Sequence, residues 1–418
     1  MLPPTLRFAA VVLPIHPAMR SPSLLVRRAA LLLAVACAGA PALPASERHP
    51  VDAWQEPARP PAAASPAPPA RPAAAAPAVL PSPVEVEVVD FPDVVDDARG
   101  GQAVAERQRP RLLPRRQRDA TPVGRSVPMK VHLPTAGGPW PVVVVSHGAG
   151  GDRDTHFAQA QDLAAHGYVV VCLEHVGSNR DRLTQGLRPL QNLDAMIRDA
   201  DEVLARPRDV AFAIDQVERW NRSHPRLRGR CDLARVGAMG HSFGAFTTMV
   251  VCGMRPALDW LVPPVPPGKG LGPDLRDARV RCGVALSPQG VGEPFFVAAS
   301  FGSLQAPLLG VSGDDDHQQA GQPARNRRDA FARWPDGDHR FVWLANASHL
   351  DFTDATGTSR RMQPSPTRAA VQPMVKRATL AFFDWQLKGD AQSTATLSVE
   401  GLRPLLHGDV DAVEVLAK

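Results

Sequence analysis

Short apolar runs and amphipathic stretches alternate along most of the chain, beginning near Val84. Eight runs rich in β-branched residues have the length of buried strands, at 84–89, 127–133, 141–148, 168–175, 234–240, 282–287, 306–313 and 341–347. Five stretches with helical spacing alternate with most of these runs, at 156–167, 208–220, 243–254, 325–334 and 375–387. Near-continuous apolar strands separated by helices are typical of a parallel sheet that is buried on both faces. The pattern therefore predicts an α/β fold with a mainly parallel, eight-stranded sheet and helices on both faces. Ligands in such folds bind beyond the carboxyl ends of the strands.

The first 40 residues differ from the rest of the chain. Residues 29–40 form an apolar run that follows two arginines and contains small residues suited to cleavage. These features predict a secretory signal peptide over residues 1–40, with Met19 as an alternative start. The run is shorter than the roughly 20 apolar residues that a membrane-spanning helix needs. We therefore expect no transmembrane segment and an exported protein, periplasmic or secreted, with a lipoprotein anchored at Cys37 as the alternative.

Composition separates a tether from a folded domain. Of the 418 residues, 44 are proline, and many of these lie among alanines between residues 41 and 83. Such a segment cannot bury enough apolar surface to fold, so we predict a disordered tether at 41–83 and one domain at 84–418. An arginine-rich insert at 107–118 is interpreted as a solvated loop, with contact to membrane phosphates as the alternative. The net charge of +5 is small for this length and argues against nucleic acid as a partner.

Residues 240–244, Gly-His-Ser-Phe-Gly, match the pattern G-x-S-x-G. An apolar strand precedes the motif and a predicted helix follows it, which is the context in which a serine becomes a nucleophile. The glycines allow a tight turn that lifts the Ser242 hydroxyl above the sheet, and the helix N-terminus favours developing negative charge. The motif therefore predicts that Ser242 is a nucleophile.

A serine hydroxyl needs a base, and the base needs an orienting carboxylate. On this type of turn the acid and then the histidine follow the serine along the chain. Four histidines follow Ser242, at positions 317, 339, 349 and 407. His349 comes just after the strand at 341–347, at the same sheet edge as Ser242, whereas His339 precedes that strand. We therefore predict His349 as the base.

The acid is expected after the strand at 306–313, where three carboxylates follow one another. Asp316 is the first choice and Asp315 the second, and the sequence does not decide which of these two or Asp314 points inward. A calcium loop is disfavoured because the alternating oxygen ligands and the closing glutamate are absent. The glycine-rich residues 146–151 end another strand and can direct a backbone N–H at an oxyanion, together with the N–H of Phe243.

These residues resemble the α/β-hydrolase superfamily, and specifically bacterial dienelactone hydrolase-like proteins and the platelet-activating-factor acetylhydrolase group. The stretches that carry the resemblance span residues 127–385, and they include PWPVVVVSHGAGG, GHSFGAFT, SGDDDH and ASHLDFTD. The resemblance implies Ser242 as nucleophile, His349 as base and Asp316 as acid. It also implies that the backbone amides of Ala149 and Phe243 form an oxyanion hole.

Two features depart from these relatives. Dienelactone hydrolases use a cysteine nucleophile where this chain has Ser242. In the eukaryotic acetylhydrolases the acid follows the strand right after the nucleophile, but here residues 287–290 contain no carboxylate. The acid is therefore expected one strand later, an arrangement that is similar to exported polyester hydrolases and cutinase-like enzymes.

We therefore predict a serine esterase that cleaves small carboxylic esters with an acyl or aromatic group through an acyl-enzyme, without a metal or cofactor. A lipase, polyester hydrolase, thioesterase or peptidase on the same residues, and a catalytically silent binding domain tethered to the envelope, are the alternatives. Segments 176–206 and 255–281 are expected to shape the pocket. A disulfide between Cys252 and Cys282 is a further hypothesis, because an oxidising compartment would permit it.

Overall fold

The computed structural model describes residues 82–99, 124–262, 270–292, 294–317, 323–353, 366–408 and 410–418. All of them belong to one structural unit, which spans residues 72–418. The predicted signal peptide, nearly all of the predicted tether and the arginine-rich insert lie outside the described residues.

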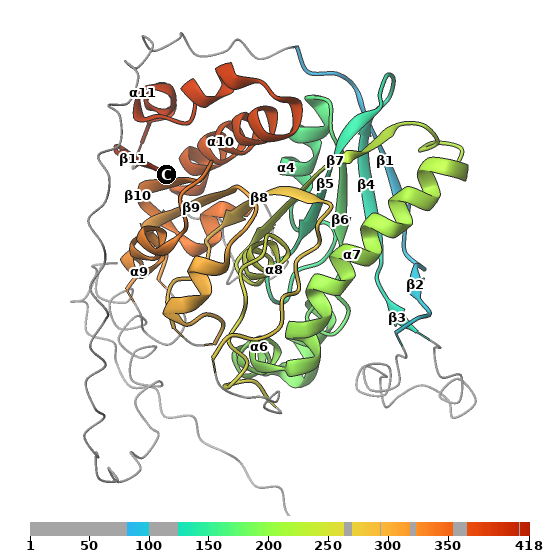
Figure 1. Cartoon of the computed structure of the whole chain (residues 1–418), viewed down its shortest axis with the longest axis horizontal. Coiled ribbons are helices and arrows are strands. Elements are labelled where there is room, and N and C mark those ends of the chain that lie inside the picture. The colour runs from blue at the N-terminus through green and yellow to red at the C-terminus, as the bar shows by residue number, and fades with distance from the viewer. Residues whose placement is uncertain are drawn as a thin grey trace, which may run out of the picture. The chain divides into compact units, whose positions relative to one another are not determined.

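A nine-stranded sheet forms the centre of this unit (Figure 1), in the order β1-β4-β6-β5-β7-β8-β9-β10-β11. The strands are β1 (Val86–Phe91), β4 (Met129–Pro134), β5 (Trp140–Ser146), β6 (Val169–Leu173), β7 (Cys231–His241), β8 (Val280–Leu286), β9 (Leu308–Asp315), β10 (Arg340–Ser348) and β11 (Val413–Ala417). The six strands from β6 to β10 pair in parallel, whereas β1, β4 and β11 join the sheet antiparallel. A separate ribbon pairs β2 (Val95–Asp96) with β3 (Arg125–Ser126).

The predicted α/β class with a mostly parallel sheet is confirmed, whereas the predicted count of eight strands is wrong. All eight predicted runs contain strands, and the ninth strand, β11, lies at the sheet edge. Its first four residues are only partly buried and one of them is Glu414, so β11 lacks the continuous apolar run of a central strand. An edge strand pairs with another strand on one side only. Because its side chains are only partly buried, its composition resembles that of a loop.

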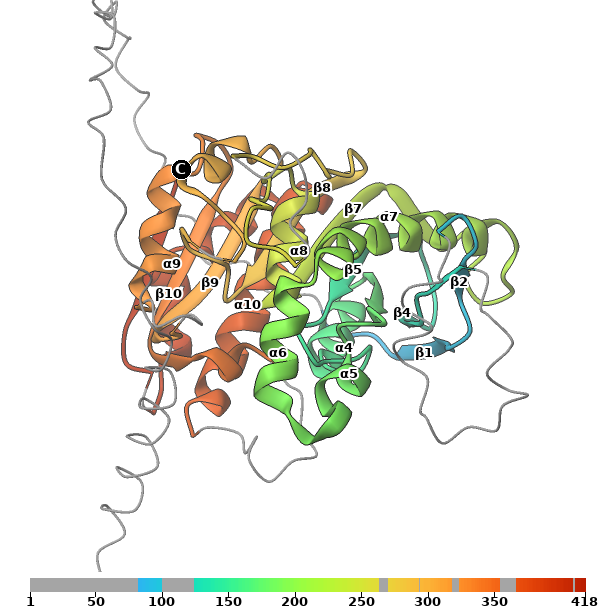
Figure 2. The same ribbon diagram turned by 90° about the horizontal axis from the view of Figure 1, so that it is seen from below.

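Two apolar cores pack against the sheet. Alternate residues of β5 belong to different cores, with Val142 and Val144 in one and Val143 and Val145 in the other, as the period of a strand requires. The first core includes residues of α7 (Ala200–Ser223) and α8 (Phe243–Val251), and the second includes residues of α4 (Phe157–Ala165) and α10 (Arg368–Lys388). Figure 2 shows these helices from a second direction.

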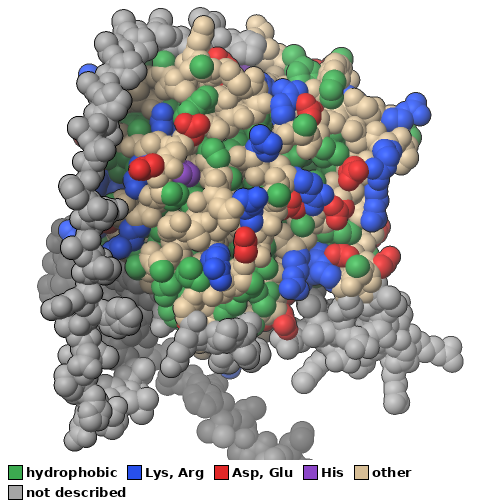
Figure 3. All heavy atoms as spheres, viewed as in Figure 1, with side chains coloured by type: hydrophobic (Ala, Val, Ile, Leu, Met, Phe, Trp, Pro, Cys, Tyr) green, Lys and Arg blue, Asp and Glu red, His purple; other side chains and the backbone are tan. Residues whose placement is uncertain are grey.

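Shorter helices complete the described residues. They are α5 (Arg180–Thr184), α6 (Pro189–Arg198), α9 (Arg325–Asp329), α11 (Val399–Leu402) and the 3₁₀ helices η1 (Gln185–Leu187), η2 (Ala298–Ser303), η4 (Ala330–Arg333), η5 (His349–Phe352), η6 (Ala391–Ala395) and η7 (Arg403–Leu405). Within the described ranges, no helix has both the length and the apolar character needed to cross a membrane. Basic and acidic side chains are interspersed on the face seen in Figure 3.

The four cysteines in the described ranges are buried free thiols, so the hypothesis of a Cys252–Cys282 disulfide is wrong for this structure. Burial raises the pKa of Cys252 to about 12, which keeps its thiol protonated and unreactive at neutral pH.

The parallel strands bring their carboxyl ends to one edge of the sheet. Strands β5, β7, β8, β9 and β10 end there at Ser146, His241, Leu286, Asp315 and Ser348. The predicted site residues lie on the turns that follow these strand ends.

Candidate active site

Ser242 lies on the turn between β7 and α8, in a backbone conformation that side chains rarely adopt, with φ 56° and ψ −116°. Both motif glycines are required sterically. A Cβ on Gly240 would lie 2.3 Å from the carbonyl oxygen of Gly244, and a Cβ on Gly244 would lie 1.8 Å from that of Ser146. The turn therefore needs glycine on each side of a strained serine, and strain of this kind is concentrated at functional sites.

The structure brings Ser242, His349 and Asp316 together. His349 begins η5 directly after β10, and its Nε2 lies 3.0 Å from Ser242 Oγ. Its Nδ1 lies 2.7 Å from Asp316 Oδ1. With the Nδ1 proton donated to Asp316, Nε2 carries the lone pair that accepts the serine proton. His349 is 33% exposed, whereas Asp316 is completely buried, so the base faces the solvent and the acid does not.

Hydrogen bonds and an ion pair surround the Asp316 carboxylate. Ser312 donates to Oδ2 at 2.7 Å, Ser287 donates to Oδ1 at 3.0 Å, and Arg327 Nη2 lies 3.3 Å from Oδ1. Burial alone would raise the pKa of Asp316, but the positive Arg327 and the contacts with His349 and Ser312 outweigh it and hold the pKa below its usual value. Asp316 is therefore an anion at neutral pH.

The other two carboxylates of the run face outward. Asp314 and Asp315 are exposed at the end of β9, and Asp314 Oδ1 accepts the backbone N–H of Asn346. Of the two acid choices made from the sequence, the structure places Asp316, the first, in hydrogen-bond contact with His349.

Three further residues hold this group in place, and no sequence pattern assigns them a functional role. Ser287 directly follows β8 with φ 55°, and its Oγ lies 2.9 Å from His349 Nδ1. Arg327 of α9 donates to the backbone oxygens of Asp316 at 2.9 Å and Pro288 at 2.7 Å, which ties the two turns together. His241 Nε2 donates to the backbone oxygen of His349 at 2.8 Å.

The glycine-rich turn after β5 lies beside Ser242. A Cβ on Gly148 would lie 3.5 Å from Ser242 Cβ, so the residue before Ala149 lies against the nucleophile. In the described part of the chain, the N–H groups of Ala149 and Phe243 donate no hydrogen bond to a backbone or side-chain acceptor. Both amides therefore remain available to an oxygen atom that forms next to Ser242.

The segments expected to shape the pocket have different surroundings. In segment 176–206, Leu183 packs on the glycine-rich turn, since a Cβ on Gly150 would lie 2.4 Å from Leu183 Cδ2. In segment 255–281, Leu258 and Leu261 are buried in the core, and residues 263–269 lie outside the described ranges.

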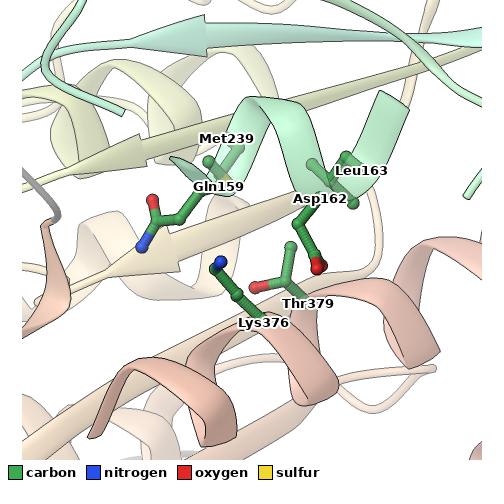
Figure 4. A pocket seen from close by; sticks show the side chains of 6 residues that line it. All are labelled: Gln159, Asp162, Leu163, Met239, Lys376 and Thr379. Carbon is green, nitrogen blue, oxygen red and sulfur yellow. The ribbon is translucent and has the colours of Figure 1, made fainter. Parts of the chain in front are cut away.

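A narrow gap, too small to hold a water molecule, lies between α4 and α10 (Figure 4). It is lined by Gln159, Asp162, Leu163, Met239, Lys376 and Thr379, and none of the predicted site residues is among them. In the described ranges, no group of three or more histidine, cysteine, aspartate or glutamate side chains is arranged to hold a metal ion.

Comparison with known proteins relates the chain to acetylhydrolases. The profile of a family described as "Platelet-activating factor acetylhydrolase, isoform II" matches residues 119–184, which include the glycine-rich turn. The platelet-activating factor acetylhydrolase of Canis lupus familiaris is 20% identical over 272 residues, which cover 58% of this chain and 53% of that protein. That of Cavia porcellus is 23% identical over 292 residues, which cover 62% of this chain and 60% of that protein.

The chain thus spans somewhat more than half the length of the relatives it matches. A special likeness to bacterial dienelactone hydrolases stays a prediction. The resemblance to the acetylhydrolases is confirmed: the chain is similar to the platelet-activating factor acetylhydrolases, and its sheet fits the α/β-hydrolase fold.

Proposed function

We propose that this protein is a serine hydrolase that cleaves carboxylic esters through an acyl-enzyme. One observation carries the proposal: the strained Ser242 has its Oγ 3.0 Å from His349 Nε2, whose Nδ1 lies 2.7 Å from the buried Asp316. A nucleophile, a base and an orienting carboxylate in this order are what acyl transfer requires.

The geometry supports the following steps. Ser242 Oγ attacks the ester carbonyl carbon while its proton passes to His349 Nε2, and the carbonyl oxygen becomes an oxyanion. The anionic Asp316 stabilises the imidazolium, and the amides of Ala149 and Phe243 donate to the oxyanion. When the intermediate collapses, the ester C–O bond breaks and His349 returns the proton to the leaving alcohol. A water molecule, activated by His349 in the same way, then releases the carboxylic acid and restores Ser242.

Short acyl esters are the substrate class that we propose first. The relatives are named as acetylhydrolases, which corresponds to a two-carbon acyl group. Because the chain spans only part of those proteins, platelet-activating factor itself is not carried over as the substrate. We further propose that the protein is exported, periplasmic or secreted, on the basis of the signal-peptide pattern in residues 1–40.

An acyl-chain series tests the proposal. The purified protein should hydrolyse p-nitrophenyl acetate and butyrate faster than the decanoate, and a fluorophosphonate should label it at Ser242. The Ser242→Ala variant should lose both properties, whereas Ser223→Ala, which alters an exposed serine at the end of α7, should keep them. Labelling of Ser242→Ala at the wild-type level would identify another nucleophile. Faster cleavage of long-chain esters, thioesters or peptides would favour the lipase, thioesterase or peptidase alternative.

A further inference from the structure

We propose that Arg206 of α7 is a positioning residue that holds both halves of the oxyanion hole. This inference rests on the proposed function, because it assumes that the amides of Ala149 and Phe243 receive the oxyanion. Arg206 is completely buried, and burial of a guanidinium is costly unless its donors are satisfied. Its contacts lead to the two turns that carry these amides.

The first half of the hole is the turn after β5. Arg206 Nη2 donates to Ser146 Oγ at 3.1 Å and also to the backbone oxygen of His147. These two residues end β5 and begin the turn, so the guanidinium fixes the direction in which the chain approaches Ala149. A donor fork that bonds two acceptors on one segment restricts its orientation more than a single bond does.

The same guanidinium also reaches the far side of this turn. Arg206 Nη1 donates to Ser178 Oγ at 2.7 Å, and the backbone oxygen of Ser178 accepts the N–H of Gly150 at 2.9 Å. Ala149 therefore lies between two points that are both tied to Arg206.

The second half of the hole is the first turn of α8. Arg206 Nε donates to Thr247 Oγ1 at 3.0 Å, and that hydroxyl donates to the backbone oxygen of Phe243 at 3.0 Å. The guanidinium carbon also lies 4.2 Å from the centroid of the Phe243 ring, within the range of a cation–π contact. Arg206 therefore contacts the residue whose amide forms the second donor.

A directed chain of hydrogen bonds extends behind Arg206. Ser146 Oγ lies 2.8 Å from His175 Nε2, and His175 Nδ1 lies 2.8 Å from Asp209 Oδ2. Burial and the nearby Arg206 lower the pKa of His175 to about 3, so the imidazole is neutral. A neutral imidazole donates from Nδ1 to the carboxylate and accepts from Ser146, whose oxygen in turn accepts from Arg206.

The hydrogen-bonded series Ser146–His175–Asp209 has the residue types of a catalytic triad, but these side chains are not accessible to a substrate. Ser146 is 2% exposed, and His175 and Asp209 are completely buried. Its geometry suits it instead to orient Ser146 as an acceptor for Arg206. Among the described residues, no carboxylate lies within ion-pair distance of the Arg206 guanidinium. Its positive charge, left without a direct counter-ion, therefore also favours an oxyanion on the neighbouring amides.

The test compares Arg206→Gln and Arg206→Lys with the wild type on p-nitrophenyl acetate. Loss of one oxyanion-hole donor lowers kcat by about 10²-fold, so we expect Arg206→Gln to lower kcat by about tenfold to 10²-fold with KM nearly unchanged. Affinity for a trifluoromethyl ketone, whose adduct with Ser242 carries an oxyanion, should fall by a similar factor. Arg206→Lys should recover part of both losses, because it keeps the charge but not the fork.

Arg230→Gln is the matched control. Arg230 is partly buried and pairs with Glu87 at 2.7 Å, but it lies just before β7, at the opposite end of that strand from Ser242. We expect a lower melting temperature and an unchanged kcat in this variant. Equal losses of kcat in Arg206→Gln and Arg230→Gln, or a folded Arg206→Gln variant with the kcat of the wild type, would overturn the inference.

Two milder variants keep the inference testable if Arg206→Gln does not fold. Thr247→Val and Ser146→Ala each remove one acceptor of Arg206, and each should lower kcat and trifluoromethyl ketone affinity together. Wild-type values of kcat in both would refute the inference. If the wild-type protein hydrolyses no ester and Ser242 is not labelled, the proposed function fails. If the wild type is active and the Arg206 variants match it, only the positioning role fails.

Discussion

Asp314, Asp315 and Asp316 follow one another at the end of β9 and differ in burial. This difference decides which of the three carboxylates can orient His349. Asp316 is completely buried against His349, Ser312 and Ser287, whereas Asp314 and Asp315 are exposed. Asp314 accepts the backbone N–H of Asn346 instead of a donor from the active site, and an exposed side chain such as Asp315 is held less firmly than a buried one. The buried one has its position set by every donor around it.

The first prediction separates these carboxylates. Asp316→Asn removes the anion that orients His349 and stabilises its protonated form, so kcat should fall by about 10³-fold to 10⁴-fold. Asp315→Asn, an exposed neighbour with the same change in charge, should change kcat by less than about twofold. Steady-state hydrolysis of p-nitrophenyl acetate measures both. Loss of activity in Asp315→Asn with full activity in Asp316→Asn would reverse the assignment.

The second prediction concerns Ser287, whose hydroxyl donates to Asp316 while its backbone has φ 55°. Ser287→Ala and Ser287→Gly both remove the hydroxyl, so both should lower kcat by a similar factor, up to about tenfold. Glycine adopts a positive φ without strain, so Ser287→Gly should be more stable than Ser287→Ala by about 1 kcal/mol. Kinetics and urea unfolding of the pair test this. A kcat that follows stability instead of the missing hydroxyl would contradict it.

At the scale of elements, the central strands could be predicted from the sequence, but the side-chain contacts that join different strands and helices could not. The eight central runs are apolar because both faces of a parallel strand are buried, and this leaves a local signal in the sequence. Strand β11 has no such signal, since its residues are only partly buried at the edge. Ser242 was found because its turn needs two glycines at fixed spacing.

The positioning residues have no local signal of this kind. Arg327 and Arg206 reach their partners from helices, across 11 residues to Asp316 and 60 to Ser146, and arginine is common in this chain. The inward direction of Asp316 likewise depends on Ser287, 29 residues away. The direction of each of these side chains depends on how whole helices and strands pack together. A single sequence contains no local pattern that predicts this packing.

The third prediction tests the packing between β5 and α8. A Cβ on Gly244 would lie 1.8 Å from the Ser146 carbonyl oxygen, and backbone on both sides prevents relief. Gly244→Ala should therefore lower the free energy of unfolding by more than about 3 kcal/mol and abolish hydrolysis. Gly302→Ala is the control, because Gly302 is exposed and no atom lies within 4 Å of the added Cβ. Its stability should stay within about 0.5 kcal/mol of the wild type, as urea unfolding can show. A stable and active Gly244→Ala variant would mean that the two elements are not packed as described.

At the scale of the molecule, the carboxyl edge of the sheet contains several histidines that are removed from water. His147, His175 and His241 follow or end β5, β6 and β7, and all three are almost completely buried. Burial, followed by neighbouring positive groups, lowers the pKa of His147 and His241 well below the usual value and that of His175 to about 3. The folded protein therefore holds them neutral at a pH where the unfolded chain protonates them.

This difference predicts how the stability of the whole domain depends on pH. Each histidine has a lower pKa in the folded state than the 6.5 of the unfolded chain, so below pH 6.5 the unfolded chain binds more protons. The stabilisation is complete above pH 6.5 and is lost as the pH falls towards the folded values. Burial also lowers the pKa of His132 and His339, elsewhere in the domain, to about 4. Together these five groups should lower the free energy of unfolding by about 7 kcal/mol between pH 7.5 and 5.5. The anionic Asp316 adds nothing in this interval, because its stabilisation is lost only below the ordinary carboxyl pKa of 3.8.

Urea unfolding at a series of pH values between 7.5 and 5.5 measures this slope directly. His175→Gln removes one of the five groups, so the slope should fall by about one fifth even though the variant is less stable at every pH. Because the slope counts protons taken up on unfolding, it separates the loss of a titrating group from the loss of packing. A flat stability profile over this interval would show that these buried imidazoles are already accessible to protons in the folded protein. The description of neutral, closely packed histidines at the edge of the sheet that carries the Ser242 turn would then be wrong.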